Sequence, residues 1–510
     1  MSPRNIEDIY PLSPMQQGML FHTLYAPDSE VYVEQTSCTL RGELDVSAFL
    51  QAWQQVVDRH QVLRSGFLIE GVEEPVQVVE RQVSLPVEQA DWLNLSPVDQ
   101  HARLEEFLVA DRKKGFVLDQ APLMRLALFR TADDSYCFVW NHHHALLDGW
   151  SIPLLFREVF ASYEALRRGR QPDLGPARLY SDYIAWLQQQ DIGKAEAFWR
   201  QTLRGFGAPT PLTVDRLPDN DQQAAGYGEE ETRLSIETTT RLQTLARQQH
   251  VTVNTLVQAA WALLLSRYSG EDDVLFGATV SGRPPDLPGA ESMIGLFINT
   301  LPVRVQVAPE LSLASWLQNL QNQQAELRQF EYTPLFQVQG WSDVPRSLPL
   351  FESILVFENY PVDSTLEAMA GSVRIENVRS FERTNYPLTV VAGVGDGLML
   401  KISYDRKRFA GETIQRMLGH LSTLLTGMAD APEARLVDVP MLSRREWQQI
   451  VVEWNATAKP YPDRQCIHEL FESWAERTPD AVALTFEGQS LTYGELNRRA
   501  NQLAHYLQKL

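Results

Sequence analysis

The 510-residue chain is acidic and has an ordinary hydrophobic content of 44%, which narrows the classes of protein to which it can belong. It carries 65 acidic against 45 basic side chains, a formal net charge of -20, and no pronounced basic run, so nucleic-acid binding is disfavoured. No apolar run approaches the length of a membrane span, the first residues lack a signal-peptide core, and the three cysteines lie too far apart to indicate a disulfide framework. We therefore expect a cytoplasmic protein with no membrane partner, long enough for about three domains or two large ones.

The chain up to a Pro- and Gly-rich boundary at 168–177 is predicted to form an α+β unit. Ser13 and Gln16 have the spacing of a helix capping box. A further helix, from about Asp45 to His60, is followed by Arg64, whose charge either interacts with the helix C-terminus or pairs with a buried acid elsewhere. The pattern also predicts helices at 98–112 and 152–168 and strands at 67–70, 76–80 and 136–140.

A second α+β unit is predicted from about residue 177 to 435. It contains a segment, 294–304, that is apolar on both sides of the chain and encloses Asn299 and Thr300. Buried polar side chains need partners, so these two are candidates for structural hydrogen bonds, the commoner case, or for contacts with a substrate. The other predicted elements are helices at 180–189, 194–203, 239–249, 252–268, 312–330 and 412–428 and strands at 231–235, 274–280, 353–358, 388–394 and 398–404.

The composition changes after this unit, where 436–463 is predicted to be a linker. Beyond it, the pattern predicts a helix at 466–478, a strand at 481–487 and a helix from 491. A segment of about 45 residues cannot bury a core alone, so we expect 464–510 to be the incomplete start of a further domain.

The stretch most clearly linked to chemistry is Asn141-His142-His143-His144-Ala145-Leu146-Leu147-Asp148-Gly149-Trp150, which follows a strand that is apolar on both faces. Along an extended chain His142 and His144 share one face and His143 takes the other. A metal site would have only the pair His142 and His144, with no third ligand at a telling spacing, so we expect no metal. A histidine, with an ordinary pKa of about 6.5, is suited to accepting a proton during catalysis.

Several motifs occur in one order along the chain: 13–22, 59–67, 143–151, 180–186, 294–304 and Arg383-Thr384-Asn385-Tyr386-Pro387-Leu388. Together they resemble the condensation domain of nonribosomal peptide synthetases over roughly residues 5–440. In particular, His143-His144-Ala145-Leu146-Leu147-Asp148-Gly149 resembles the His-His-x-x-x-Asp-Gly signature of that family. The later stretch Leu491-Thr492-Tyr493-Gly494-Glu495-Leu496-Asn497 looks like the first core motif of an adenylation domain.

The resemblance implies an α+β fold of two chloramphenicol-acetyltransferase-like lobes that form a V-shaped pseudo-dimer. The N-terminal lobe would cover 1–176 and the C-terminal lobe 177–435, with the active site in a tunnel between them. The loop 281–293 is expected to cross from one lobe to the other. The stretches 12–20 and 146–150 look more like the subclass whose donor ends in a D-configured residue.

The reaction implied is attack of the amine of an aminoacyl thioester on an upstream peptidyl thioester. By the resemblance His144 acts as base or as positioner of the amine, two roles that stay open, and His143 is directed inward. Asp148 is expected to be a scaffold paired with Arg64, and the Gly149 N–H to stabilise an oxyanion. Residues expected to support or line the site are Trp150, Asn299, Thr300 and Asn385.

The same resemblance names the partners. Both substrates would arrive on the 4'-phosphopantetheine arms of an upstream and a downstream carrier protein, and the domain itself would bind no cofactor. Its own downstream adenylation domain would be a further partner. The alternatives are a general acyltransferase of the same superfold, an epimerisation domain, and a non-catalytic module that recruits carrier proteins. The intact His144 favours an active enzyme.

Overall fold

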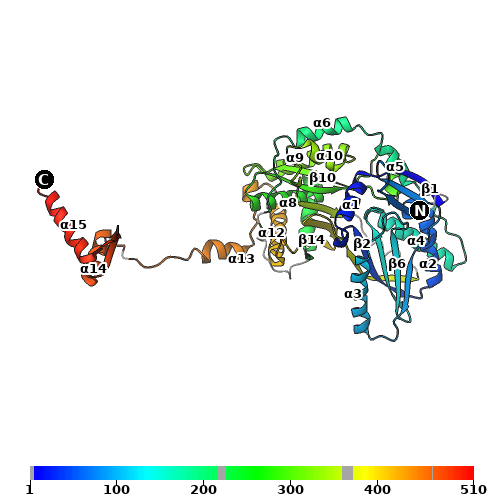
Figure 1. Cartoon of the computed structure of the whole chain (residues 1–510), viewed down its shortest axis with the longest axis horizontal. Helices are drawn as coiled ribbons and strands as arrows, with labels where there is room; N and C mark the ends of the chain where they lie inside the picture. The colour runs from blue at the N-terminus through cyan, green and yellow to red at the C-terminus, as the bar shows by residue number, and fades with distance from the viewer. Residues whose placement is uncertain (1–4, 213, 215–225, 359–371, 462) are drawn as a thin grey trace. The chain divides into compact units, whose positions relative to one another are not determined.

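The computed structural model describes residues 5–212, 214, 226–358, 372–461 and 463–510. The chain divides into two compact units, Met1–Ser443 and Arg444–Leu510. The first unit is a mixed α/β structure with two large sheets (Figure 1). Residues 436–443, predicted to belong to the linker, are part of this unit because Leu436 and Val439 are buried in its core. Residue 462 of the predicted linker lies outside the described residues.

A five-stranded sheet of order β12-β2-β7-β6-β5 organises the N-terminal half of the first unit. Its strands are β2 (Val33–Gly42), β5 (Val87–Asp91), β6 (Met124–Ala132), β7 (Ser135–His143) and β12 (Val373–Phe381). Phe138 and Trp140, on one face of β7, contact Trp53 of helix α2 (Val46–Arg59) and are covered by α4 (Ser151–Arg167). Cys137 and Val139, on the opposite face, pack towards α3 (Pro97–Lys113), and Figure 1 shows α3 on the other side of the strands from α2 and α4.

Local sequence explains several of these elements. Ser13 caps helix α1 (Pro14–Tyr25) in the predicted capping box, because its side chain accepts from the Gln16 N–H while the Gln16 side chain accepts from the Ser13 N–H. Asp45 caps α2 in a similar way, through the Ala48 N–H.

A small sheet of order β1-β4-β3 completes this half, with β1 (Ile6–Pro11), β3 (Ser65–Leu68) and β4 (Val76–Glu80).

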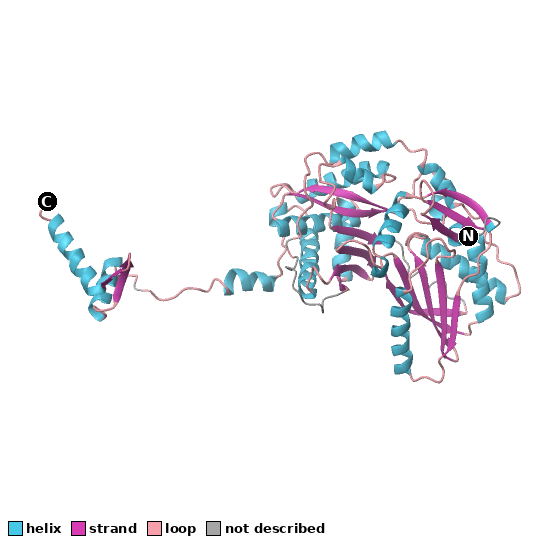
Figure 2. Ribbon diagram, viewed as in Figure 1, coloured by secondary structure: helices cyan, strands magenta, loops and turns pink. Residues whose placement is uncertain are grey.

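A six-stranded sheet of order β10-β9-β11-β13-β14-β8 organises the C-terminal half (Figure 2). Its core contains the strongly apolar helix α8 (Val253–Ser269), in which the run from Thr255 to Ser266 is buried throughout. The strands are β8 (Tyr227–Arg233), β9 (Asp273–Val280), β10 (Asn299–Gln306), β11 (Ser353–Glu358), β13 (Leu388–Gly395) and β14 (Gly397–Asp405). The helices are α6 (Ile192–Thr202), α7 (Ile236–Gln248), α8 (Val253–Ser269), α9 (Leu313–Leu327), α10 (Leu335–Trp341) and α12 (Gly411–Asp430). Helix α5 (Tyr180–Leu187) packs instead in the core of the N-terminal half, where Tyr180, Tyr183 and Ile184 are buried.

Strand β12 links the two halves of the first unit. It lies in the sequence region expected to form the C-terminal lobe, yet it pairs antiparallel with β2, from Val373 opposite Gly42 to Phe381 opposite Gln35. A division of the chain at residue 176 therefore does not separate the two sheets completely. The sequence pattern did not predict β2, β6 or β12. The pairing of β2 with β12 joins distant parts of the chain and leaves no local signal, whereas β6 forms a hairpin with β7 and was missed although its sequence is rich in apolar residues.

The second unit is small. It contains the helical segments Arg444–Trp447 and Gln448–Glu453 within the predicted linker, followed by α14 (Ile467–Arg477), the hairpin β15 (Val482–Phe486) and β16 (Gln489–Thr492), and α15 (Tyr493–Leu507). Ala475 is its one described residue with a buried side chain. Within the described part of the whole chain, no helix is long and apolar enough to span a bilayer.

Candidate active site

A cavity of about 970 Å³ lies in the first unit and is lined by both of its halves. The end of β7 contributes His142 and His144, and the turn that follows contributes Asp148 and Gly149. The C-terminal half contributes Thr300 and many further residues, among them Val280–Asp286, Glu331, Tyr332 and Tyr386. A cavity of this size and mixed polarity is suited to an extended organic substrate.

His144 presents one ring nitrogen to this cavity. Its Nδ1 lies 2.8 Å from the Leu147 carbonyl oxygen, which can only accept, so the neutral ring carries its proton on Nδ1. The Nε2 lone pair is therefore free to accept a proton, and Nε2 lies 4.0 Å from Oε1 of Glu382. The side chain is 11% exposed, which shields it from bulk water but leaves it accessible from the cavity. This geometry suits either a general base or an acceptor that orients an amine.

His143 points away from the cavity, as expected for its place on the opposite strand face. Its Nδ1 accepts from the Ala145 N–H at 3.1 Å, so the proton sits on Nε2, 3.1 Å from the Thr23 hydroxyl oxygen. The Thr23 hydroxyl donates in turn to the Met19 carbonyl. Burial lowers the pKa of His143 to about 3, so the ring is neutral. His143 is a fixed scaffold residue and does not line the cavity.

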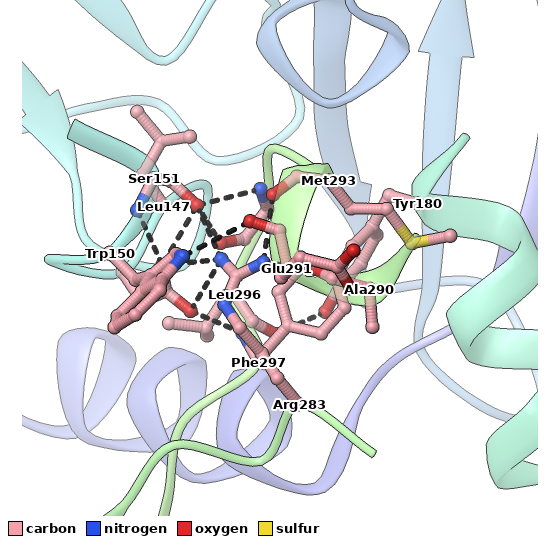
Figure 3. Close-up of polar contacts among 12 residues, drawn as sticks. Leu147, Trp150, Ser151, Tyr180, Arg283, Ala290, Glu291, Met293, Leu296 and Phe297 are labelled. Atoms are coloured by element: carbon pink, nitrogen blue, oxygen red, sulfur yellow. Dashed lines mark hydrogen bonds and ion pairs between the residues drawn. The ribbon is translucent and has the colours of Figure 1, made fainter. Parts of the chain in front are cut away.

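Asp148 is completely buried and lies at the centre of a hydrogen-bond network. Its carboxylate accepts from the Ser151 N–H at 2.9 Å, from the Ser151 hydroxyl at 2.8 Å and from the Phe297 N–H at 3.0 Å. Its cationic partner is Arg283, at 3.0 Å, whose guanidinium also lies 4.1 Å from the centre of the Phe297 ring. Figure 3 shows Arg283 reaching Ser151 and the carbonyl groups of Ala290 and Met293 as well. This network fixes the loop 281–293 against the turn after β7.

The expected pairing of Asp148 with Arg64 is wrong. Arg64 is buried, but its guanidinium bonds Glu7 at 2.7 Å and the backbone carbonyls of Glu80 and Arg81. Arg64 therefore supports the small sheet beside the site. Arg283, the partner that Asp148 does have, is the one basic residue of the Pro- and Gly-rich loop 281–293, and this was the only signal that the sequence offered.

Trp150 and Gly149 hold the edge of the cavity. The Trp150 indole donates to the Glu291 carbonyl at 3.1 Å, which makes a second link between this turn and the loop 281–293. Gly149 lines the cavity, as a backbone donor to an oxyanion must. Trp150 thus links the turn to the loop 281–293, while its supporting role and the oxyanion role of Gly149 stay predictions.

Of the three residues expected to line the tunnel, Thr300 lines the cavity and the other two do not. Asn299 is buried, and its amide donates to the Glu331 and Thr333 carbonyls, both at 2.8 Å. Asn385 accepts at 2.5 Å from the hydroxyl of Tyr32, and Tyr32 itself lines the cavity. Both asparagines are occupied by the protein, so they position neighbouring segments.

Two acidic residues near His144 were not predicted. In the described part of the chain, Glu34, His144 and Glu382 form one group of potential metal-ligating side chains whose atoms lie within 4.8 Å of one another. Burial raises the pKa of Glu34 well above its ordinary value, and the nearby Glu382 raises it further. Glu34 lies on β2 and Glu382 directly follows β12, far away in the sequence, so no local motif indicated them.

The fold and the His144 site together define a class of enzyme. The family model described as Condensation domain matches residues 6–451, and the model described as AMP-binding enzyme matches residues 471–510. The chain therefore belongs to the condensation-domain family, the amide-forming acyltransferases of nonribosomal peptide synthetases, and its last residues, 471–510, are a short adenylation segment. Both the family and the two-lobed α+β fold implied by the motifs are confirmed.

The gramicidin synthase subunits that this chain matches are far longer than the chain itself. It is 51% identical to linear gramicidin synthase subunits C and D of Brevibacillus parabrevis, and each alignment covers 99% of the chain but only 6% and 10% of those proteins. Among solved structures, a four-domain nonribosomal peptide synthetase bound to AMP and glycine matches 99% of the chain and 39% of its own length (TM-score 0.75, 20% identity). The X-domain from teicoplanin biosynthesis matches 87% of the chain and 99% of its own length (TM-score 0.72, 25% identity).

Proposed function

We propose that this domain transfers a carrier-bound peptidyl or aminoacyl thioester to the amine of a second, carrier-bound aminoacyl thioester. The observation that carries the proposal is His144, whose Nδ1 is engaged by the Leu147 carbonyl and which lines a cavity shared by the two halves of the fold. A thioester is already activated, so the step needs a positioned neutral amine and a route for its proton. His144 can supply both, and the Asp148–Arg283 network keeps the turn that carries it in place.

The substrates and partners follow from the same proposal. The donor and the acceptor arrive on 4'-phosphopantetheine arms of upstream and downstream carrier proteins, and the domain binds no cofactor of its own. The downstream adenylation domain, of which 464–510 is the start, is the neighbouring partner. The motifs at 12–20 and 146–150 favour a donor whose terminal residue has the D configuration. The acidic chain and its free cysteines fit a cytoplasmic enzyme.

A condensation assay with purified carrier proteins tests this function. The wild-type chain is expected to form dipeptide, and His144→Ala to lose a factor of about 10² or more, since general-base catalysis contributes about 10²–10⁴-fold. Thermal unfolding of the variant checks that the fold is intact. Near-normal turnover of the His144→Ala variant would show that His144 takes no part in the mechanism.

The same assay tests the donor subclass when it is run with donors that end in a D- or an L-residue. We expect the D-terminated donor to be consumed faster. A preference for the L-terminated donor would reject the subclass while leaving the condensation reaction in place.

A further inference from the structure

The ends of three neighbouring strands bring a set of acid and base side chains together beside His144. In the pairing of β12 with β2, Phe381 stands opposite Gln35, so the next residue, Glu382, follows on towards Glu34. In the pairing of β2 with β7, Glu34 stands opposite His142. Directly opposed residues share a face of a sheet, and His144 continues the His142 face by one more step. Glu382, Glu34, His142 and His144 all line the cavity.

This set has hydrogen-bonding capacity that the described residues leave unused. Oε1 of Glu34 and both ring nitrogens of His142 are buried without a hydrogen-bond partner. The His142 ring is held instead by stacking on Trp140, with 4.3 Å between ring centres. Buried polar atoms without partners are rare in folded proteins and call for an explanation, such as a ligand that supplies the missing partner.

The charge balance of the set favours a cationic ligand. Besides Glu382, the charged groups that act on the Glu34 carboxyl are Glu358, which adds negative potential, and Lys401, which opposes it. His142 is kept neutral, because burial lowers its pKa well below the ordinary value. Burial and the neighbouring Glu382 raise the pKa of Glu34, because the protein supplies little cationic compensation for two carboxyl groups beside Nε2 of His144; a bound cation would favour the charged form of the pair.

The reaction has such a cation among its substrates, because an aminoacyl thioester carries its α-amine as an ammonium group. Amide formation removes two protons from that ammonium. One proton must leave before the nitrogen lone pair can attack the thioester carbonyl carbon. When the new C–N bond has formed and the C–S bond breaks, the second proton passes to the leaving thiolate. His144 Nε2 can carry one of these protons, and a second acceptor is needed for the other.

We propose that Glu382 and Glu34 form the ammonium-binding site for the acceptor substrate, next to Nε2 of His144. This inference rests on the proposed condensation function. The α-ammonium donates hydrogen bonds to the two carboxyl groups, gives its first proton to this pair and thence to solvent, and gives its second proton through His144 to the thiolate. The site therefore recognises the charge of the amine and is indifferent to the amino-acid side chain.

Binding of unreactive acceptor analogues tests the site without any turnover. The probe is glycyl-pantetheine with an amide in place of the thioester, and its partner probe is the acetyl analogue, which lacks only the amine; a leucyl and 4-methylpentanoyl pair repeats the comparison. By calorimetry in the presence of EDTA, the wild-type chain is expected to bind each ammonium probe about tenfold more tightly than its partner, about 1.4 kcal/mol. Glu382→Gln and Glu34→Gln are expected to reduce this ratio to about twofold or less.

Glu376→Gln is the matched control. Glu376 is also on the β12 side of the sheet and its side chain is 38% exposed, as is that of Glu382, but it pairs with Arg41. This variant is expected to keep the wild-type ratio. In the condensation assay, Glu382→Gln is expected to raise the KM for the acceptor carrier while the KM for the donor carrier changes little, which a purely structural role would not produce.

Equal affinities for both probes in the wild-type chain would overturn the proposal, as would a ratio that survives both substitutions. If the wild-type chain preferred the ammonium probe only in the absence of EDTA, Glu34, His144 and Glu382 would be ligands of a metal ion. That result would also overturn the proposal. The half-exposed Glu382 keeps the test valid if the variant of buried Glu34 does not fold. Activity of His144→Ala rejects the proposed function, whereas an unchanged probe ratio in Glu382→Gln rejects the ammonium site, so the two failures are distinguishable.

Discussion

Three consecutive histidines at the end of β7 occupy three different environments. His144 offers Nε2 to the cavity, His143 is locked between the Ala145 N–H and the Thr23 hydroxyl, and His142 stacks on Trp140 without a polar partner. The alternation of a strand explains why the middle ring faces the other way. The hydrogen bonds that His143 and His144 make then fix their tautomers, and with them the chemistry that each of these two rings can perform.

His143 is expected to make the stability of the first unit depend on pH. Its pKa is about 3 in the folded state against about 6.5 unfolded, so between these values the unfolded state binds a proton that the folded state does not. Stability therefore falls as pH drops below about 6.5, by about 1.4 kcal/mol per pH unit from this group. His143→Gln cannot take up a proton, so its urea-unfolding free energy is expected to fall less steeply between pH 6.5 and 4.5.

The control for this measurement is His101→Gln, a substitution at an exposed position of α3. It is expected to follow the wild-type slope. Equal slopes for His143→Gln and wild type would show that the pKa of His143 does not differ between the folded and unfolded states.

At the scale of elements, the turn after β7 is held by a loop from the other half of the fold. Arg283 binds the Asp148 carboxylate, and Trp150 binds the Glu291 carbonyl. The expected crossing of the loop 281–293 to the N-terminal half fits these two contacts. The turn that follows His144 is thus held by residues that lie far away in the sequence. These contacts keep His144 in one position.

A double-mutant cycle on Asp148→Asn and Arg283→Met measures this link. Each single variant is expected to lose about 3–5 kcal/mol, because removing one partner leaves the other buried and uncompensated. The pair is expected to be non-additive by about 1–3 kcal/mol in chemical unfolding. The comparison cycle uses Arg64→Met with Asp148→Asn, which share no partner and are expected to be additive. Coupling in the second cycle but not in the first would restore the Arg64 pairing.

At the scale of the whole molecule, the core lies within the first unit. The three clusters of buried apolar side chains belong to residues before 444, whereas Ile467 and Phe486 of the second unit are 88% and 69% exposed. A segment with so little buried surface has no cooperative core of its own. The second unit is therefore expected to add little to the stability of the condensation domain.

Removal of residues 444–510 tests this expectation. The unfolding temperature of the remaining chain is expected to stay within about 2 °C of the full chain, since the change touches no buried cluster. Scanning calorimetry measures it, and the loss of exposed apolar side chains is expected to raise solubility in the same preparation. A fall of about 5 °C or more would mean that the first unit depends on the second.

By itself the sequence determined the family, through its ordered motifs, and most helices and the opposite directions of the His143 and His144 side chains, because capping residues, helical periodicity and strand alternation are local properties. The tertiary structure decided what is not local. It paired β12 with β2, gave Asp148 its partner Arg283 in place of Arg64, and turned Asn299 and Asn385 into structural residues. It also brought Glu34 and Glu382 to His144, because strand pairing joins residues whose separation in the chain carries no signal.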